Sequence, residues 1–143
     1  DGETFTQDDL AKKDVTVINF WSVGCGPCVD EMPEIAELAK SLPDNVQIIT
    51  VNFDGQRGKS EVERILDEAG FEGITLVSGN GDLAEVCGEI MYTPTTIFVD
   101  KDGNIVGDEI IGRQEDTREA FLAGINATLK SMTPNVLFKN HKG

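Results

Sequence analysis

Two cysteines three positions apart, Cys25 and Cys28, stand between an apolar, β-branched run over residues 15–21 and a helical pattern over residues 26–42. The apolar run predicts a central strand that is covered on both faces. Because three residues make nearly one helical turn, the two cysteine side chains should share a face of the helix. Their Cα atoms would then be about 5–6 Å apart, a separation that a disulfide tolerates. The pattern therefore predicts a redox-active pair at the start of a helix.

This position also favours chemical reactivity. The first turn of a helix presents unpaired N–H groups and a partial positive charge, which stabilise a thiolate. We expect the pKa of Cys25 to fall below the free value of about 8.5, so that Cys25 attacks disulfides. Cys28, one turn deeper, would resolve the mixed disulfide. Pro27 suits a first helical turn, where its missing N–H costs nothing.

Other uses of a C-x-x-C pair fit less well. A structural zinc site needs about four ligands, and the chain adds only Cys87 and His141. A c-type haem site needs His after the second cysteine, where Val29 stands. A plain structural disulfide is the third alternative. Cys87 lies at helical spacing among apolar residues and is predicted to be a small buried side chain, with a third redox thiol as the alternative.

Composition and charge restrict the partners and the cellular location that we expect for this chain. The chain has 143 residues and a formal net charge of −14, which argues against a nucleic-acid partner. No run approaches the roughly 18 apolar residues of a membrane span. The chain begins at Asp1 without a methionine and shows no signal peptide, as in a processed fragment, and a removed signal or lipid anchor is compatible with that start. We expect an extracytoplasmic location, with the cytoplasm as the alternative.

The order of predicted elements indicates an α/β fold in one domain, residues 1–143, with a core over about 5–132 and a polar tail over 133–143. Strands that alternate with helices favour parallel pairing, and a hairpin at Asp102-Gly103 adds antiparallel pairing, which gives a mixed sheet of about five strands with helices on both faces. The strands are expected over 15–21, 46–53, 74–77, 95–99 and 104–111. The helices are expected over 26–42, 60–69 with Ser60 as its cap, 82–90 and 114–132.

Several segments resemble a known family. Residues 21–28 are similar to the active-site segment of thioredoxin, and residues 92–96 to the thioredoxin loop that faces the dithiol and holds a cis-proline, here Pro94. The resemblance implies a thioredoxin fold and a set of substrate-contacting residues, in which Trp21 and Tyr92 could equally be ordinary packed side chains. This set is Trp21, Gly26, Pro27, Tyr92, Thr93 and Pro94.

Within that superfamily the chain is most similar to the TlpA/ResA-type thiol-disulfide oxidoreductases, over about residues 5–132. The segments that carry this likeness are 5–10, 28–33, 94–103 and an extra helix and strand over about 60–77. One departure from thioredoxin is Asn19, where thioredoxin has a buried Asp. Glu31 is the candidate replacement as proton acceptor, with a solvated helix carboxylate as the alternative. Gly24 replaces an aromatic residue of many relatives, and Arg113 receives no role.

The resemblance implies a thiol-disulfide oxidoreductase that reduces disulfides of partner proteins. Its catalytic residues would be Cys25, Cys28 and Glu31, and it would need no metal or organic cofactor beyond the Cys25–Cys28 disulfide. We expect a monomer that receives electrons from an upstream dithiol protein. The resemblance implies a place in cytochrome c maturation or in other extracytoplasmic thiol reduction. Two alternatives stay open. One is a thiol peroxidase using Ser22 beside Cys25, although no matching Arg is evident, and the other is a docking or metal-delivery module.

Overall fold

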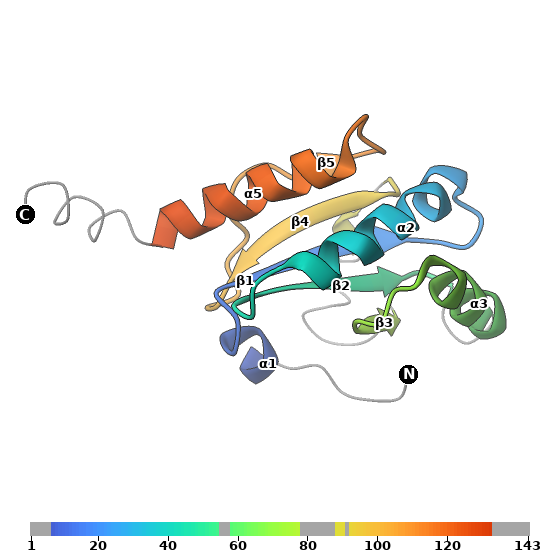
Figure 1. Cartoon of the computed structure of the whole chain (residues 1–143), viewed down its shortest axis with the longest axis horizontal. Helices are drawn as coiled ribbons and strands as arrows, with labels where there is room; N and C mark the ends of the chain where they lie inside the picture. Colours follow the sequence, from blue (N-terminus) through green and yellow to red (C-terminus); the bar gives the residue numbers. More distant parts are fainter. Residues whose placement is uncertain (1–6, 55–57, 78–87, 91, 133–143) are drawn as a thin grey trace, which may run out of the picture.

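A mixed five-stranded sheet forms the centre of the computed structural model, which describes residues 7–54, 58–77, 88–90 and 92–132 (Figure 1). The sheet order is β3-β2-β1-β4-β5. The β1/β2 and β2/β3 pairs are parallel, whereas β1/β4 and β4/β5 are antiparallel. The strands are β1 Val15–Trp21, β2 Val46–Asn52, β3 Thr75–Val77, β4 Thr95–Asp100 and β5 Ile110–Ile111.

The last strand is shorter than the predicted 104–111. Gly107 has φ of 72°, which takes the backbone out of the extended region, so that pairing with β4 before Ile110 is reduced to a single bridge between Val99 and Ile105. The strand predicted over 15–21 has the bounds of β1.

The helices named in the described part of the chain are α1 Gln7–Ala11, α2 Gly26–Ser41, α3 Lys59–Ala69 and α5 Thr117–Met132. The prediction that Ser60 caps α3 is wrong, because Gly58 occupies the cap position and Ser60 lies inside the helix. Helix α5 begins three residues later than predicted because Asp116 accepts a hydrogen bond from the Glu119 N–H (3.0 Å), which is the contact of an N-cap residue. The predicted helix around Cys87 falls largely outside the described residues.

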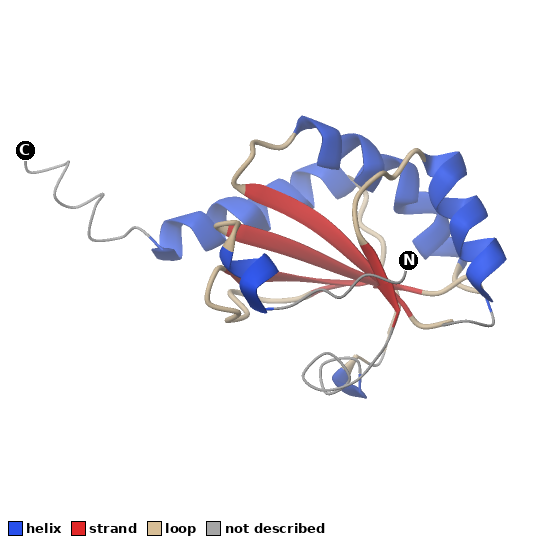
Figure 2. Ribbon diagram, turned by 90° about the horizontal axis from the view of Figure 1, so that it is seen from below, coloured by secondary structure: helices blue, strands red, loops and turns tan. Residues whose placement is uncertain are grey.

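The two faces of the sheet are covered differently. Helices α2, α3 and α5 lie on one side in Figure 2. Val15 and Val17 of β1 pack on that side with residues of α2 and α5, while Phe20 points the other way and packs with Leu10 of α1. Since side chains alternate along a strand, Asn19 and Trp21 face the same helices as Val15 and Val17. This places polar Asn19 beneath α2, next to the cysteine pair.

Candidate redox site

The two cysteines form a disulfide at the start of α2. Their Cα atoms are 5.3 Å apart, within the predicted range. Cys25 is the N-cap residue, and its sulfur accepts a hydrogen bond from the Cys28 N–H at 3.2 Å. Cys25 is partly exposed, whereas Cys28 is 0% exposed. An incoming disulfide can therefore reach Cys25 and not Cys28.

One side of Cys28 is apolar. It packs in a cluster with Trp21 of β1 and Met32 of α2, and with Val62 and Ile65 of α3. The indole of Trp21 has no exposed surface, and its Nε1 has no hydrogen-bond partner. The prediction that Trp21 forms part of a substrate-contacting surface is thus corrected, since its side chain is fully buried in the cluster that contains Cys28.

A buried acid lies one turn further along α2. Glu31 is 2% exposed, and its Oε1 accepts a hydrogen bond from Asn19 Nδ2 at 3.1 Å. The same Nδ2 also donates to Thr96 Oγ1 of β4 at 3.0 Å. We call Asn19, Glu31 and Thr96 the acid cluster. The alternative of a solvated carboxylate is wrong for Glu31, because its side chain is closed off from water.

Burial sets the acidity of Glu31. Loss of hydration disfavours the carboxylate and is the main reason that its pKa rises from 4.5 to about 7. The Asn19 hydrogen bond and the charge of Arg113 oppose this rise, whereas the charge of Glu34 adds to it. An acid with a pKa near neutrality can both take and release a proton at pH 7. Glu31 lies three residues after Cys28, so both belong to the same side of α2.

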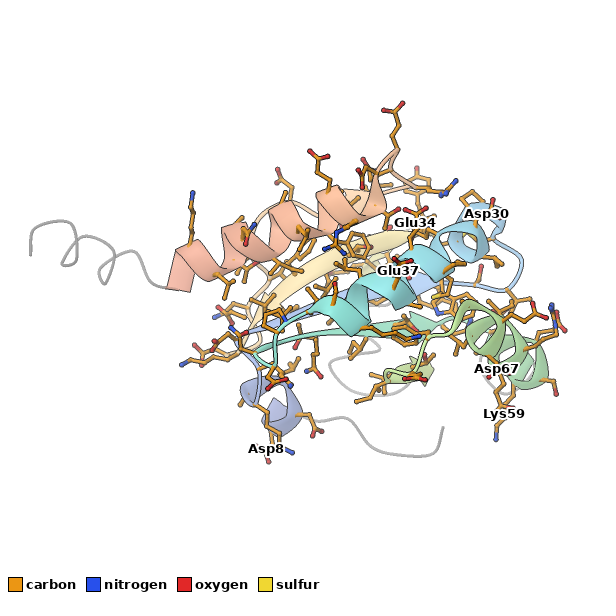
Figure 3. The ribbon with its side chains drawn as sticks, in the orientation of Figure 1. Asp8, Asp30, Glu34, Glu37, Lys59 and Asp67 are labelled. Atoms are coloured by element: carbon orange, nitrogen blue, oxygen red, sulfur yellow. A yellow bond between two sulfur atoms is a disulfide. The ribbon has the colours of Figure 1, made fainter. Side chains whose placement is uncertain are left out.

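Arg113 lies beside this cluster, although the sequence indicated no role for it. Its Nη2 is 3.0 Å from Oε1 of Glu34, one turn beyond Glu31 on α2. Figure 3 labels Glu34 on α2, on the side towards α5. The two partners are 79 positions apart in sequence, so no local pattern could have joined them.

A second polar group holds the loop in front of Cys25. Asp54 Oδ2 accepts hydrogen bonds from the Val23 N–H (2.7 Å) and from Asn52 Nδ2 (3.0 Å). Asn52 Oδ1 in turn accepts from the Asp54 N–H at 2.8 Å. We call Asn52 and Asp54 the loop clamp. Sequence reasoning missed it, although an Asn-x-Asp that begins on the last residue of a buried strand is a recognisable turn signal.

The loop before β4 also reaches the site. The Thr93–Pro94 peptide bond is cis, as the resemblance implied. Tyr92 is 63% exposed, and its carbonyl accepts a hydrogen bond from Thr95 Oγ1 at 2.6 Å. The Gly112 N–H donates to the Pro94 carbonyl at 2.8 Å, which ties the loop after β5 to this one. Thr96, two residues after Pro94, links the same segment to Asn19.

A shallow pocket of about 250 Å³ lies between α2 and α3, beside the segment that carries the cysteines. Its walls combine apolar side chains with the ion pairs of Arg64. The lining residues are Val23, Val29, Pro33, Glu61, Arg64, Ile65, Glu68 and Ala69.

Within the described ranges, no three or more His, Cys, Asp or Glu side chains are grouped so as to hold a metal ion. Nor does any helix of the described chain combine the length and apolar character needed to cross a membrane. The predictions for Cys87 and His141 lie outside the described residues.

Comparison with known proteins places this site in a family. A family model described as Redoxin matches residues 1–122. Thiol-disulfide oxidoreductase ResA of Bacillus thuringiensis is 30% identical over 135 residues, which are 94% of this chain and 72% of that protein. Thioredoxin-like protein YneN of Bacillus subtilis is 30% identical over 105 residues, 73% of this chain and 60% of that protein.

Solved structures agree in fold. The exposed lipoprotein thioredoxin Etrx1 of Streptococcus pneumoniae superposes with a TM-score of 0.66 at 27% identity, over 85% of this chain and 90% of that one. StoA of Bacillus subtilis superposes with a TM-score of 0.63 at 24% identity, over 77% of this chain and 81% of that one.

A thioredoxin-like sheet with a cysteine pair at a helix start, together with 30% identity to ResA over 94% of the chain, defines the class as thiol-disulfide oxidoreductase. The chain belongs to the Redoxin family of the thioredoxin superfamily, and its similarity to ResA confirms the resemblance to the TlpA/ResA type.

Proposed function

We propose that this chain reduces disulfide bonds in partner proteins, with Cys25 as the attacking and Cys28 as the resolving residue. The observation that carries the proposal is the contrast in exposure across one disulfide, in which Cys25 is accessible at the helix start and Cys28 is completely buried. The N–H of Cys28 already points at the Cys25 sulfur, where it would stabilise a thiolate after reduction.

The proposed cycle transfers two electrons from the reduced cysteine pair to a partner disulfide. The Cys25 thiolate attacks one sulfur of a partner disulfide, and the other partner sulfur leaves as a thiolate. Cys28 then gives its proton to Glu31, and its thiolate attacks the Cys25 sulfur, which breaks the intermolecular bond. The second partner sulfur leaves as a thiolate and takes the proton from Glu31, while the first takes a proton from solvent. The partner is then a dithiol, Glu31 is ionised again, and this chain holds the Cys25–Cys28 disulfide. An upstream dithiol protein returns it to the reduced form, so that no metal or organic cofactor takes part.

Partner recognition is proposed for the exposed surface around the disulfide. Gly26 and Pro27 are exposed beside Cys25, Tyr92 is 63% exposed, and Thr93 is partly exposed. Pro94 is buried, so its proposed contribution is to hold the shape of that loop through the carbonyl that receives the Gly112 N–H. We propose that the chain acts there as a monomer.

The relatives suggest a cellular setting. Etrx1 is named as an exposed lipoprotein, and other relatives carry the name ResA. We therefore propose that this chain works outside the cytoplasm. The narrower proposal, which rests on the resemblance alone, is that it reduces a disulfide of apocytochrome c and so keeps the apocytochrome thiols reduced.

The proposal is tested with two serine variants made in a Cys87→Ala background, so that a third thiol cannot form false cross-links. Cys25→Ser should abolish insulin reduction, whereas Cys28→Ser should accumulate a mixed disulfide that mass spectrometry detects. The Cys87→Ala parent serves as the matched control and should turn over normally. Equal trapping by both variants would contradict the assigned roles.

A further inference from the structure

The loop that carries Arg113 is anchored at the redox site. Gly112, directly before it, donates its N–H to the Pro94 carbonyl at 2.8 Å and turns the chain with φ of 83°, a conformation that favours glycine. The Gln114 side chain donates to the Gly112 carbonyl at 3.1 Å. Arg113 is thus held between two residues whose positions are fixed by hydrogen bonds.

From this anchor Arg113 reaches α2. Its guanidinium lies 3.0 Å from the Glu34 carboxylate, and both side chains are 41% exposed. Glu34 follows Glu31 by three residues, which places both carboxylates on the same side of α2. The ion pair therefore brings one positive and one negative charge close to the buried acid, each from a different element.

These two charges act on Glu31 in opposite directions. The guanidinium stabilises the Glu31 carboxylate, whereas the carboxylate of Glu34 destabilises it. Asn19 of β1, which donates a hydrogen bond to Glu31, is neutral. Thr96 of β4, which accepts a hydrogen bond from Asn19, is neutral too. Among the described residues, Arg113 and Glu34 are the charged groups that act on this acid.

We propose that Arg113 and Glu34 are positioning residues for Glu31, and that their ion pair fixes the opposing charges that set the pH at which Glu31 takes the proton of Cys28. This inference rests on the proposed function, because it assigns Glu31 the role of proton acceptor. Arg113 favours the ionised form of Glu31, which can accept a proton, and Glu34 limits this effect so that the proton can be taken up near neutral pH.

A merely structural ion pair makes a different prediction. If the contact only braced the loop against α2, Arg113→Gln and Glu34→Gln would break the same interaction and have the same effect on the site. If the charges act on Glu31, Arg113→Gln should raise the pKa of Glu31 and Glu34→Gln should lower it. The double variant should return towards the wild-type value, since both charges are then absent.

The experiment is a carbon-13 NMR titration of the Glu31 carboxyl group in the oxidised full chain, assigned with Glu31→Gln. We expect a wild-type midpoint at pH about 7. The midpoint should be higher in Arg113→Gln and lower in Glu34→Gln. Both differences should shrink at high salt, because salt screens exposed charges. Arg118→Gln is the matched control, since Arg118 contacts Ser41 at the far end of α2 (3.3 Å) and should leave the midpoint unchanged. Shifts in the same direction, or no shift, would overturn the proposal.

A second measurement connects the charges to the reaction. The pH midpoint of single-turnover disulfide reduction should move in the same direction as the Glu31 titration in each variant, and Arg113→Lys should restore most of the wild-type value. If the titration moved and the reaction midpoint did not, the proposal would be wrong. Because the NMR titration needs no substrate, it stays interpretable even if the Cys28→Ser trapping test were to fail.

Discussion

Near the ends of two neighbouring strands, an asparagine amide donates a hydrogen bond to a carboxylate, and the two carboxylates differ in their surroundings. Asn19 of β1 donates its amide to Glu31 at 3.1 Å, and Asn52 of β2 donates its amide to Asp54 at 3.0 Å. The strands are adjacent and parallel, with Asn19 two positions before the end of β1 and Asn52 at the end of β2. The acid cluster and the loop clamp therefore lie at the same end of the sheet, around one cysteine pair.

The two carboxylates, Glu31 and Asp54, differ in how deeply they are buried. Glu31 is closed off from water, so its pKa rises to about 7 and it becomes a group that exchanges protons. Asp54 is only half buried and takes a backbone N–H from Val23, two residues before Cys25. Under the proposed mechanism, the same pairing of amide and carboxylate serves proton transfer at Glu31, where water is excluded, and holds the loop at Asp54, where it is not.

Converting each acid to its amide should separate the two clusters most clearly. We expect Glu31→Gln to slow the resolution of the mixed disulfide at pH 7 by about 10²-fold, the lower end of what a positioned general base contributes, and to flatten its pH dependence. Asp54→Asn should leave that pH dependence in place. Rapid-quench kinetics from pH 5 to 9 measure both, and an unchanged profile in Glu31→Gln would remove Glu31 from the mechanism.

The second expected effect is on stability. The pKa of Glu31 is higher in the folded chain (about 7) than its ordinary value of 4.5, so the folded state binds this proton more tightly and its stability falls as pH rises from about 5 through 7. We expect oxidised wild type to lose about 2 kcal/mol of unfolding free energy between pH 5 and 8 relative to Glu31→Gln. Urea unfolding at both pH values checks this, and parallel changes in the two proteins would contradict it.

The smallest effect is expected in the loop clamp. Asp54→Ala removes the acceptor of the Val23 N–H and should lower stability by about 1 kcal/mol, the typical net value of such a hydrogen bond. Attack by Cys25 should slow to a similar extent at every pH, because loop geometry and not proton transfer is disturbed. Asp67→Ala, an exposed change on α3, is the matched control. A shifted pH midpoint in Asp54→Ala would contradict the separation of roles.

Features that depend on neighbouring residues could be predicted. Strand β1, helix α2 and the closeness of Cys25, Cys28 and Glu31 follow from local periodicity and spacing. The orientation of Trp21 could not be predicted in the same way, because an aromatic side chain at a strand end can face either a core or a groove. Only packing against α3 decides, and it buries the ring fully.

Contacts between residues far apart in the sequence could not be predicted either. Thr96 joins the acid cluster from β4, and Arg113 meets Glu34 over 79 positions. The shortened β5 depends on the backbone conformation of Gly107, whose φ of 72° is permitted by a glycine but not specified by it. These features arise from the assembled sheet, where local preferences yield to tertiary packing.

The pairing of β1 with β4 has a consequence for newly made chains. Thr96 contacts Asn19 across 77 positions, so an emerging polypeptide exposes both cysteines well before β4 has been synthesised. Until the sheet closes, Glu31 sits in water with the acidity of any surface glutamate, and the two sulfurs behave as common thiols. The buried acid beside the cysteine pair is therefore acquired on completing the fold and lost on unfolding, so an unfinished chain offers only ordinary thiols, of which few are ionised at neutral pH.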